Sequence, residues 1–100
     1  MKLKAAFMFI APEANHSKHK TVVDTPNVTL TVVGVDNYQE AEQVAIELAE
    51  EGITAIELCA AFGIEGTAIV NKAVKGKAVV GAVRFDSHPG FNYKSGDDMF

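Results

Sequence analysis

The segment TLTVVGVDNYQEAEQVAIELAEEGITAIEL, residues 29–58, decides the fold class, because it combines a strand, a helix and a second strand. Four apolar residues in its middle share the spacing of one helix face: Ala41, Val44, Ala45 and Leu48. Asp36 or Asn37 can cap the first amides of this helix, and Gly52 provides a left-handed stop. We therefore predict a helix over residues 38–51.

Four strands are predicted around this helix and a second one. Continuous apolar sequence over residues 2–10 and 78–85 is typical of strands that are covered on both faces. Residues 27–35 alternate between apolar side chains and threonines, which favours an edge strand with one solvated face. A short strand is predicted over residues 54–59, and an apolar stripe that ends at a glycine predicts the second helix over residues 65–75.

The alternation of strands and helices on short connections predicts parallel strands joined by right-handed crossovers. With the alternating strand at an edge and the apolar first strand inside, the strand order is 2-1-3-4. We therefore expect a three-layer, flavodoxin-like α/β fold with a four-stranded, mostly parallel sheet. A third helix, over residues 14–25, would cover the second face of this sheet alone. The alternative architecture is a half-barrel that closes only as a dimer.

The end of the chain is unusually aromatic. Residues 1–83 are expected to form a single α/β domain, whereas residues 84–100 form a tail that contains four of the eight aromatic residues. Because each ring can bury about 150–250 Å², we expect the tail to pack on its own sheet or on a partner subunit. Together with the apolar last strand, this predicts a homodimer.

Composition excludes several classes of protein. The chain has 100 residues, a net charge of -4 and nine scattered Lys and Arg residues, so it lacks the basic stripe of a nucleic-acid binder. No apolar run approaches the ~20 residues that span a bilayer, and the run over residues 5–11 is short for a signal peptide. The single cysteine, Cys59, cannot form an intramolecular disulfide, which favours a cytoplasmic location.

Polar residues are expected to meet at the carboxyl ends of the strands, where open parallel sheets bind ligands. A glycine-bearing turn opens the second predicted helix, and free amides there, together with the helix dipole, favour an anion. The candidate ligand-binding residues are Glu13, His16, Gly63, Gly66, Thr67 and Arg84. They predict a binding protein for a small anionic metabolite, without a cofactor. A structural turn capped by Thr67 is the alternative interpretation of the glycines.

Two other functions remain open. In a small lyase, isomerase or hydrolase, the acid, base or nucleophile would come from four residues near the same ends: Glu57, Cys59, Asp86 and His88. Structural interpretations compete, since Cys59 suits a buried apolar site and Glu57 suits an ion pair with Arg84. The third function is an oligomeric scaffold. No fixed ligand spacing predicts a metal site, although His16, His19 and His88 leave the question open.

Three stretches carry a resemblance to a known family: AAFMFIAPEA, the long segment that ends in ELCAAFGIEGTA, and VRFDSHPG. They resemble a family of short bacterial and archaeal proteins described only as a domain of unknown function. The resemblance covers nearly the whole chain and implies a stand-alone prokaryotic protein. It implies no activity, cofactor or catalytic residue. A weaker similarity links residues 52–63 to the strand and loop units of phosphate-binding α/β barrels.

Overall fold

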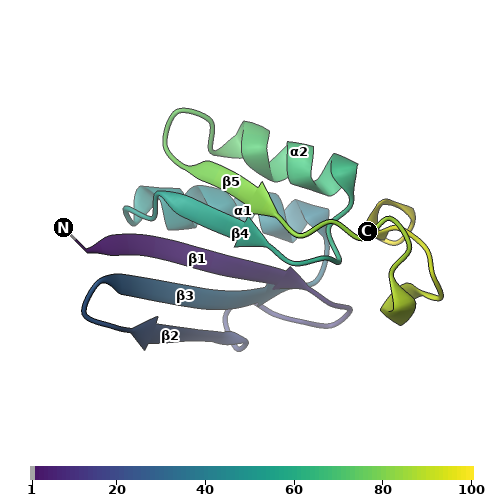
Figure 1. The fold of residues 1–100 in the computed structure, drawn as a ribbon, viewed down its shortest axis with the longest axis horizontal. Coiled ribbons are helices and arrows are strands. Elements are labelled where there is room, and N and C mark those ends of the chain that lie inside the picture. Colours follow the sequence, from purple (N-terminus) through teal and green to yellow (C-terminus); the bar gives the residue numbers. More distant parts are fainter. Residues whose placement is uncertain (1) are drawn as a thin grey trace.

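Five strands form one mixed sheet with the order β2-β3-β1-β4-β5 in the computed structural model, which describes residues 2–100 and not Met1 (Figure 1). The strands are β1 (Leu3–Ile10), β2 (Lys20–Asp24), β3 (Val28–Val35), β4 (Ala55–Leu58) and β5 (Val79–Ala82). Four of them run parallel to one another, and β2 pairs antiparallel with β3. The parallel strands lie in the predicted order, but the antiparallel fifth strand makes this a different sheet from the flavodoxin-like one.

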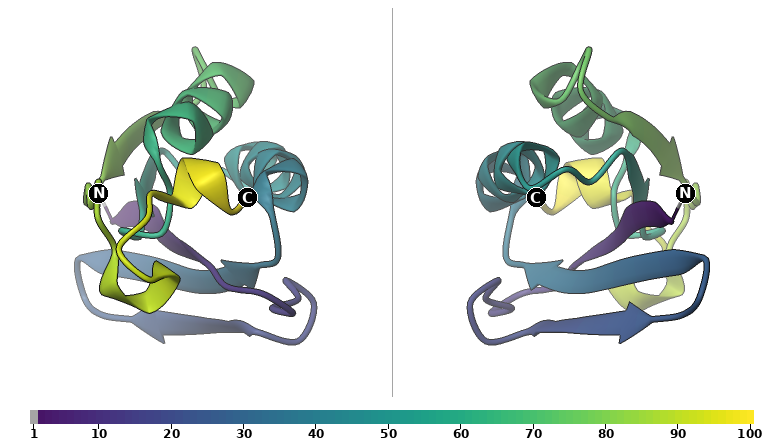
Figure 2. Two further views of the ribbon diagram at one scale, coloured as in Figure 1. Left: turned by 90° about the vertical axis from the view of Figure 1, so that its right-hand side faces the viewer. Right: turned by 90° about the vertical axis from the view of Figure 1, so that its left-hand side faces the viewer.

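The two helices, α1 (Tyr38–Glu50) and α2 (Ile64–Ala73), cover the same face of the sheet (Figure 2). The right-handed crossovers β3-α1-β4 and β4-α2-β5 explain this, because both advance across the sheet in one direction. Apolar side chains from the covered face are buried under the helices: Ala6, Met8, Ile10, Val33, Val35, Ile56 and Leu58. The molecule is a two-layer α/β fold, so the predicted third layer is wrong.

The predicted helix over residues 14–25 is wrong because this segment contains a tight turn and β2. The side chain of Asn15 accepts a hydrogen bond from the amide of Ser17 at 2.8 Å, and its carbonyl accepts one from the amide of His19 at 2.7 Å. The β-branched residues that follow favour an extended chain, which pairs with β3. β2 ends at Asp24, and Pro26 two residues later fits a boundary there.

The prediction that residues 27–35 form an edge strand with one solvated face is wrong. β3 is internal, since it lies between β1 and β2. Thr31 points toward the helices and is only 8% exposed, whereas Val28, Leu30 and Val32 lie on the face that no helix covers. The alternation therefore places apolar side chains on the face that no helix covers and Thr31 on the face under the helices.

The tail lies beyond the carboxyl ends of the strands and contains two short 3-10 helices, Pro89–Phe91 and Gly96–Asp98 (Figures 1 and 2). β5 ends at Ala82, three residues earlier than predicted. Phe91 and Phe100 pack against the core and meet with ring centroids 5.5 Å apart. The ring of Phe100 also lies 6.1 Å from that of Tyr38, the first residue of α1. Within residues 2–100, no helix has the length and apolar character needed to cross a membrane.

Candidate functional site

One end of the molecule gathers the polar groups. The loop that follows β1, the first turns of α1 and α2, the end of β5 and the tail all lie at the carboxyl ends of the parallel strands (Figure 1). Their side chains form three neighbouring groups, namely a cluster at the start of α1, a carboxylate at the start of α2, and a cavity beside β5.

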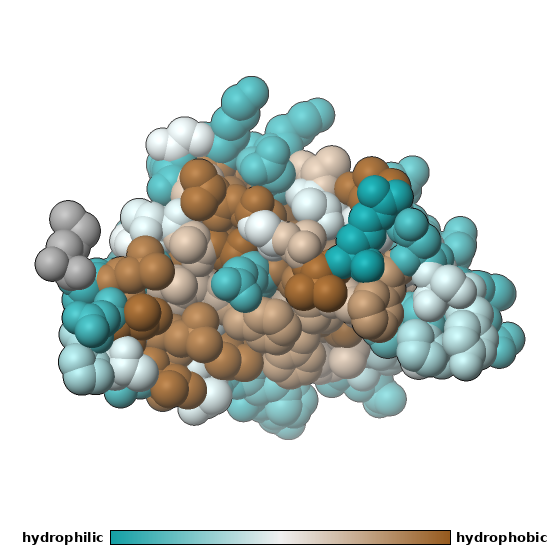
Figure 3. Space-filling model, viewed as in Figure 1, coloured by the Kyte–Doolittle hydropathy of each residue, from teal (hydrophilic) through white to brown (hydrophobic). Residues whose placement is uncertain are grey.

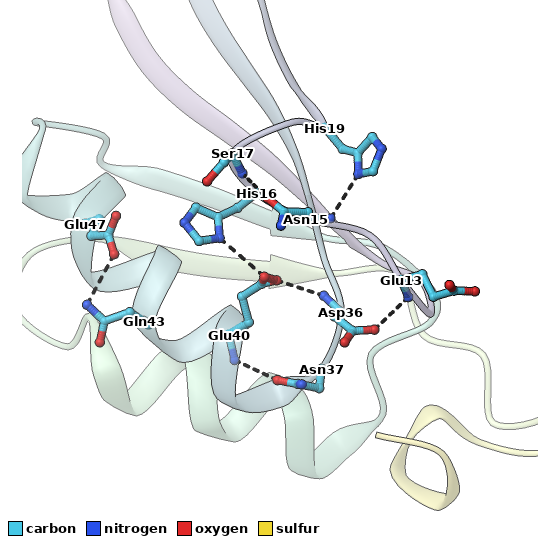
Figure 4. Close-up of polar contacts among 10 residues, drawn as sticks. All are labelled: Glu13, Asn15, His16, Ser17, His19, Asp36, Asn37, Glu40, Gln43 and Glu47. Carbon is cyan, nitrogen blue, oxygen red and sulfur yellow. Dashed lines mark hydrogen bonds and ion pairs between the residues drawn. The ribbon is translucent and has the colours of Figure 1, made fainter.

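The polar groups of the cluster at the start of α1 form hydrogen bonds with one another (Figure 4). Asn37 caps the helix, since its Oδ1 accepts a hydrogen bond from the amide of Glu40 at 2.8 Å. Glu40 reaches back, and its Oε2 accepts from the amide of Asp36 at 3.0 Å. These two bonds satisfy two backbone donors at the helix start, as a capping box does, except that Glu40 binds the amide of Asp36 and not that of the N-cap residue Asn37.

Two predicted ligand-binding residues belong to this cluster. His16 places its Nδ1 3.3 Å from Oε1 of Glu40, and the amide of Glu13 donates to Oδ1 of Asp36 at 2.7 Å (Figure 4). Glu13 has a φ of 68°, so this contact holds it in the left-handed region. The histidine and the backbone of Glu13 therefore fasten the loop after β1 to α1.

The histidines do not converge. His19 accepts a hydrogen bond at Nδ1 from the amide of Asn15, and Figure 4 shows its ring turned away from that of His16. His88 lies in the tail, where its Nδ1 accepts from the amide of Gly90 at 2.9 Å. Among residues 2–100, no three His, Cys, Asp or Glu side chains are grouped so that they could hold a metal ion.

The start of α2 already holds an anion, which is the carboxylate of Asp97 from the tail. The amides of Glu65 and Gly66 donate to it at 3.1 and 3.2 Å. The hydroxyl of Tyr38 donates to the same carboxylate at 2.8 Å and accepts from the amide of Gly63 at 3.0 Å. The amides that were predicted to bind a ligand thus bind a side chain of this protein.

The two glycines of this turn make room for the internal carboxylate and the tyrosine. A Cβ on Gly63 would collide with the carboxyl group of Asp97, and a Cβ on Gly66 would collide with the ring of Tyr38. Thr67 completes the turn, since its hydroxyl donates to the carbonyl of Gly63 at 2.9 Å. The close approach that the glycines allow is therefore intramolecular.

These contacts shift the ionisation of both partners. Burial raises the pKa of Asp97, but the hydrogen bonds from Glu65, Tyr38 and Gly66 outweigh it, so this pKa lies below its ordinary value of 3.8. Burial and the neighbouring carboxylate raise the pKa of the Tyr38 phenol. Asp97 therefore stays charged and Tyr38 stays protonated at neutral pH, which preserves the bond between them.

A cavity of about 250 Å³ lies on the other side of the α2 start, against the end of β5. Its lining residues are Phe62, Gly63, Ile64, Thr67, Ala82, Val83 and Arg84. Arg84 supplies the only charged side chain among them, and its Nε donates to Asp86 Oδ1 at 2.8 Å. No other hydrogen-bond partner of Arg84 occurs within the described chain, which leaves its terminal nitrogens for a ligand. Three predicted ligand-binding residues, Gly63, Thr67 and Arg84, are thus brought together.

Within residues 2–100, no hydrogen bond or ion pair joins any two of the four predicted catalytic residues. Glu57 is exposed on the face of the sheet opposite the helices, and no ion pair joins it to Arg84, which lines the cavity and pairs with Asp86. Cys59 is half-buried after β4, with its Sγ 3.4 Å from the amide of Ala61. His88 stacks on Phe91 with ring centroids 4.4 Å apart. These contacts are local, and none joins two of the four residues.

Sequence reasoning missed Tyr38 and Asp97, the two side chains that organise this end. The helix pattern predicts no role for Tyr38 beyond the start of the helix, and no pattern predicts the conformation of Asp97 in the tail. One signal was available. Three glycines in one region, Gly63, Gly66 and Gly96, indicate close approach between segments, and a Cβ on Gly96 would indeed collide with the carbonyl of Ala61.

Comparisons with known proteins give a family and no relative of known activity. The model of a family described as a family of unknown function, DUF6506, matches residues 3–98. A search of the curated proteins found no match. A search of the solved structures found none either.

Proposed function

Since the chain belongs to the family of unknown function DUF6506, we propose its function from the cavity beside β5: it binds a small monocarboxylate with a short apolar body. The observation that carries this proposal is the single cation, Arg84, whose Nε pairs with Asp86, at an otherwise apolar cavity at the carboxyl ends of the strands. This combination of an apolar lining and one placed charge is the usual character of a small-molecule site.

Size and lining limit the ligand. Typical ligand pockets measure about 300–1,000 Å³, and at about 250 Å³ this cavity fits only a small molecule. Phe62, Ile64 and Val83 offer apolar contact, and Ile64 and Val83 are more than half exposed. A short hydrocarbon chain would remove this apolar surface from water, and its carboxylate would pair with the guanidinium of Arg84.

The charges around the cavity favour a monoanion over a phosphate dianion. Asp86 already neutralises part of the charge of Arg84, and Asp97 occupies the amides at the start of α2. Glu65 adds another acidic residue in the first turn of α2. Three carboxylates would repel a phosphate dianion, and only one cation would attract it. A monocarboxylate is repelled less and can pair with a single edge of the guanidinium.

The proposal includes a homodimer in a prokaryotic cytoplasm. The unpaired Cys59 supports a reducing compartment. The scattered basic residues and the net charge of -4 support a ligand of small size rather than a nucleic acid. The support for the dimer lies in the uncovered face of the sheet.

The test is a titration of ¹⁵N-labelled protein with butyrate, followed by NMR, with butyramide as the neutral probe of the same size. We expect butyrate alone to shift the amides of Phe62, Ile64, Thr67 and Val83. Arg84→Gln should weaken butyrate binding about tenfold or more, because the charged hydrogen bond is lost. Lys75→Gln, which removes the positive charge of an exposed residue just after the C-terminal end of α2, should leave the affinity unchanged.

Two results would overturn the proposal. One is the absence of shifts at these amides when acetate, butyrate or hexanoate is added at 20 mM. A dissociation constant of roughly this size is the weakest that specific binding of so small a ligand would have. The other is equal weakening by Arg84→Gln and Lys75→Gln, since that would indicate a general effect of charge rather than a contact at the cavity.

A further inference from the structure

The face of the sheet opposite the helices is largely apolar, and we call it the open face. The strand register places two rows of residues across it. One row consists of Val23, Leu30, Ala5, Ala55 and Val79, and the other of Thr21, Val32, Phe7, Glu57 and Gly81. Figure 3 shows this side of the molecule as a nearly continuous hydrophobic surface over β1, β3 and β4.

No part of the described chain covers the open face. The helix expected there is replaced by β2, which extends the face instead of covering it. The tail is engaged elsewhere, since Asp97 binds the start of α2 and Phe100 packs near Tyr38. Val23 and Val79 consequently remain 51% and 71% exposed at the two edges of the sheet.

Within the open face, side chains pack against residues of the neighbouring strand. A Cβ on Gly34 would collide with the ring of Phe9, so this ring lies across the glycine of the neighbouring strand. Phe7 and Phe9 are thereby half-buried on a face without helices. Such an arrangement presents apolar side chains across neighbouring strands, which suits contact with another sheet.

The five strands of the open face provide about half of the area that each partner buries in a standard interface, so a contact between two sheets has to extend beyond them. Strand spacings of about 4.8 Å and rises of about 3.3 Å per residue give these five strands a flat footprint of roughly 450 Å². Corrugation by side chains enlarges the accessible area, and the exposed Val83 and Phe85 extend it beyond β5. The largest apolar patch on a typical monomer is about 300–600 Å², and a standard interface buries about 800 Å² on each partner.

We infer that a second copy of this chain covers the open face, so that two sheets pack face to face around a two-fold axis. A second copy supplies a surface of equal area and the same apolar character, as a self-complementary interface requires. Glu57 is the single charged residue in the two rows, and no lysine or arginine lies in them. The face therefore lacks the cations that would draw it to an anionic membrane surface.

The experiment is sedimentation equilibrium of the whole protein from 1 to 200 μM, with two matched variants on one strand. Val22 and Val23 are neighbours in β2, are 53% and 51% exposed, and point to opposite faces of the sheet. We expect the wild type to dimerise. Val23→Asp should raise the dimer dissociation constant at least about tenfold by placing an unpaired carboxylate in the interface. Val22→Asp should leave it unchanged.

A third variant guards against misfolding. Val79→Asp places the same charge at the other edge of the open face, where the valine is 71% exposed, and it should also weaken the dimer. Circular dichroism melting curves identify any variant that fails to fold. If Val23→Asp fails to fold, Val79→Asp takes its place, and the reverse holds as well. Pelleting with phosphatidylcholine vesicles tests a lipid surface as the occupant.

Four outcomes would overturn the inference. The first is a wild type that stays monomeric at 200 μM, and the second is a monomer that pellets with the vesicles. The third is a dimer that Val22→Asp weakens as much as Val23→Asp does. The fourth is a dimer that neither Val23→Asp nor Val79→Asp weakens, because its interface then lies elsewhere.

Discussion

The two helices begin in opposite ways. α1 is capped by its own neighbours, since Asn37 accepts from the amide of Glu40 and Glu40 accepts from the amide of Asp36. α2 has no side-chain cap at Gly63, and its first amides are bound instead by Asp97, more than thirty residues later in the chain. The same physical need, which is to satisfy free amides at a helix start, is met locally in one helix and by tertiary contact in the other.

The difference has a structural consequence. Because Asp97 belongs to the tail, the cap of α2 also fastens the tail to the domain, with Tyr38 as the link between the two helices. Loss of a cap at α1 should therefore weaken one helix, whereas loss of the cap at α2 should weaken the helix and release the tail. The predictions below test this contrast.

The largest effect is expected for Gly66→Ala. In an ordinary helix this change stabilises by up to about 1 kcal/mol, because alanine has the higher helix propensity. Here the new Cβ would collide with the ring of Tyr38, so we expect a net destabilisation of about 1–3 kcal/mol. Chemical denaturation measures it. Gly81→Ala is the control, since nothing lies within 4 Å of its Cβ position, and a stabilised Gly66→Ala would contradict the packing described here.

Asp97→Asn should follow, with a loss of about 1–2 kcal/mol, because an amide is a weaker acceptor than a carboxylate for three donors. Asp98→Asn removes the same charge from the next residue, which is exposed, and should change the stability by less than about 0.5 kcal/mol. Hydrogen exchange should also accelerate at the amides of Glu65 and Gly66 and in residues 96–100 in Asp97→Asn alone. Equal effects of the two changes would show that only net charge matters.

The contribution of Asp97 should depend on pH. Its pKa is lowered in the folded protein, so the charged carboxylate stabilises the fold fully above the ordinary value of 3.8. This stability is lost as the pH falls through the lowered pKa. The difference in unfolding free energy between wild type and Asp97→Asn should therefore be constant from pH 7 to about pH 5 and shrink at lower pH. A difference that grows on acidification would contradict the assignment.

The same contrast explains how much of this molecule can be predicted from its sequence. α1, its cap and the order of the four parallel strands follow from signals within short windows, and the cavity residues Gly63, Thr67 and Arg84 follow from the topology. The partner of the α2 amides could not be predicted, because it depends on where a distant tail folds. β2 was missed because the turn at Asn15 that returns the chain resembles the start of a helix.

The smallest of these effects is expected for the local cap. Asn37→Ala removes the acceptor of the Glu40 amide and should cost about 1 kcal/mol, the usual loss for an N-cap. Asn37 is exposed and its side chain bonds within the first turn of α1 rather than to the tail, so faster hydrogen exchange should be confined to that turn. Gln39→Ala, at an exposed position two residues later, provides the control and should cost little. If Asn37→Ala instead accelerated exchange in residues 96–100 as Asp97→Asn does, the two caps would be coupled through Tyr38, and the separation between local and distant capping would fail.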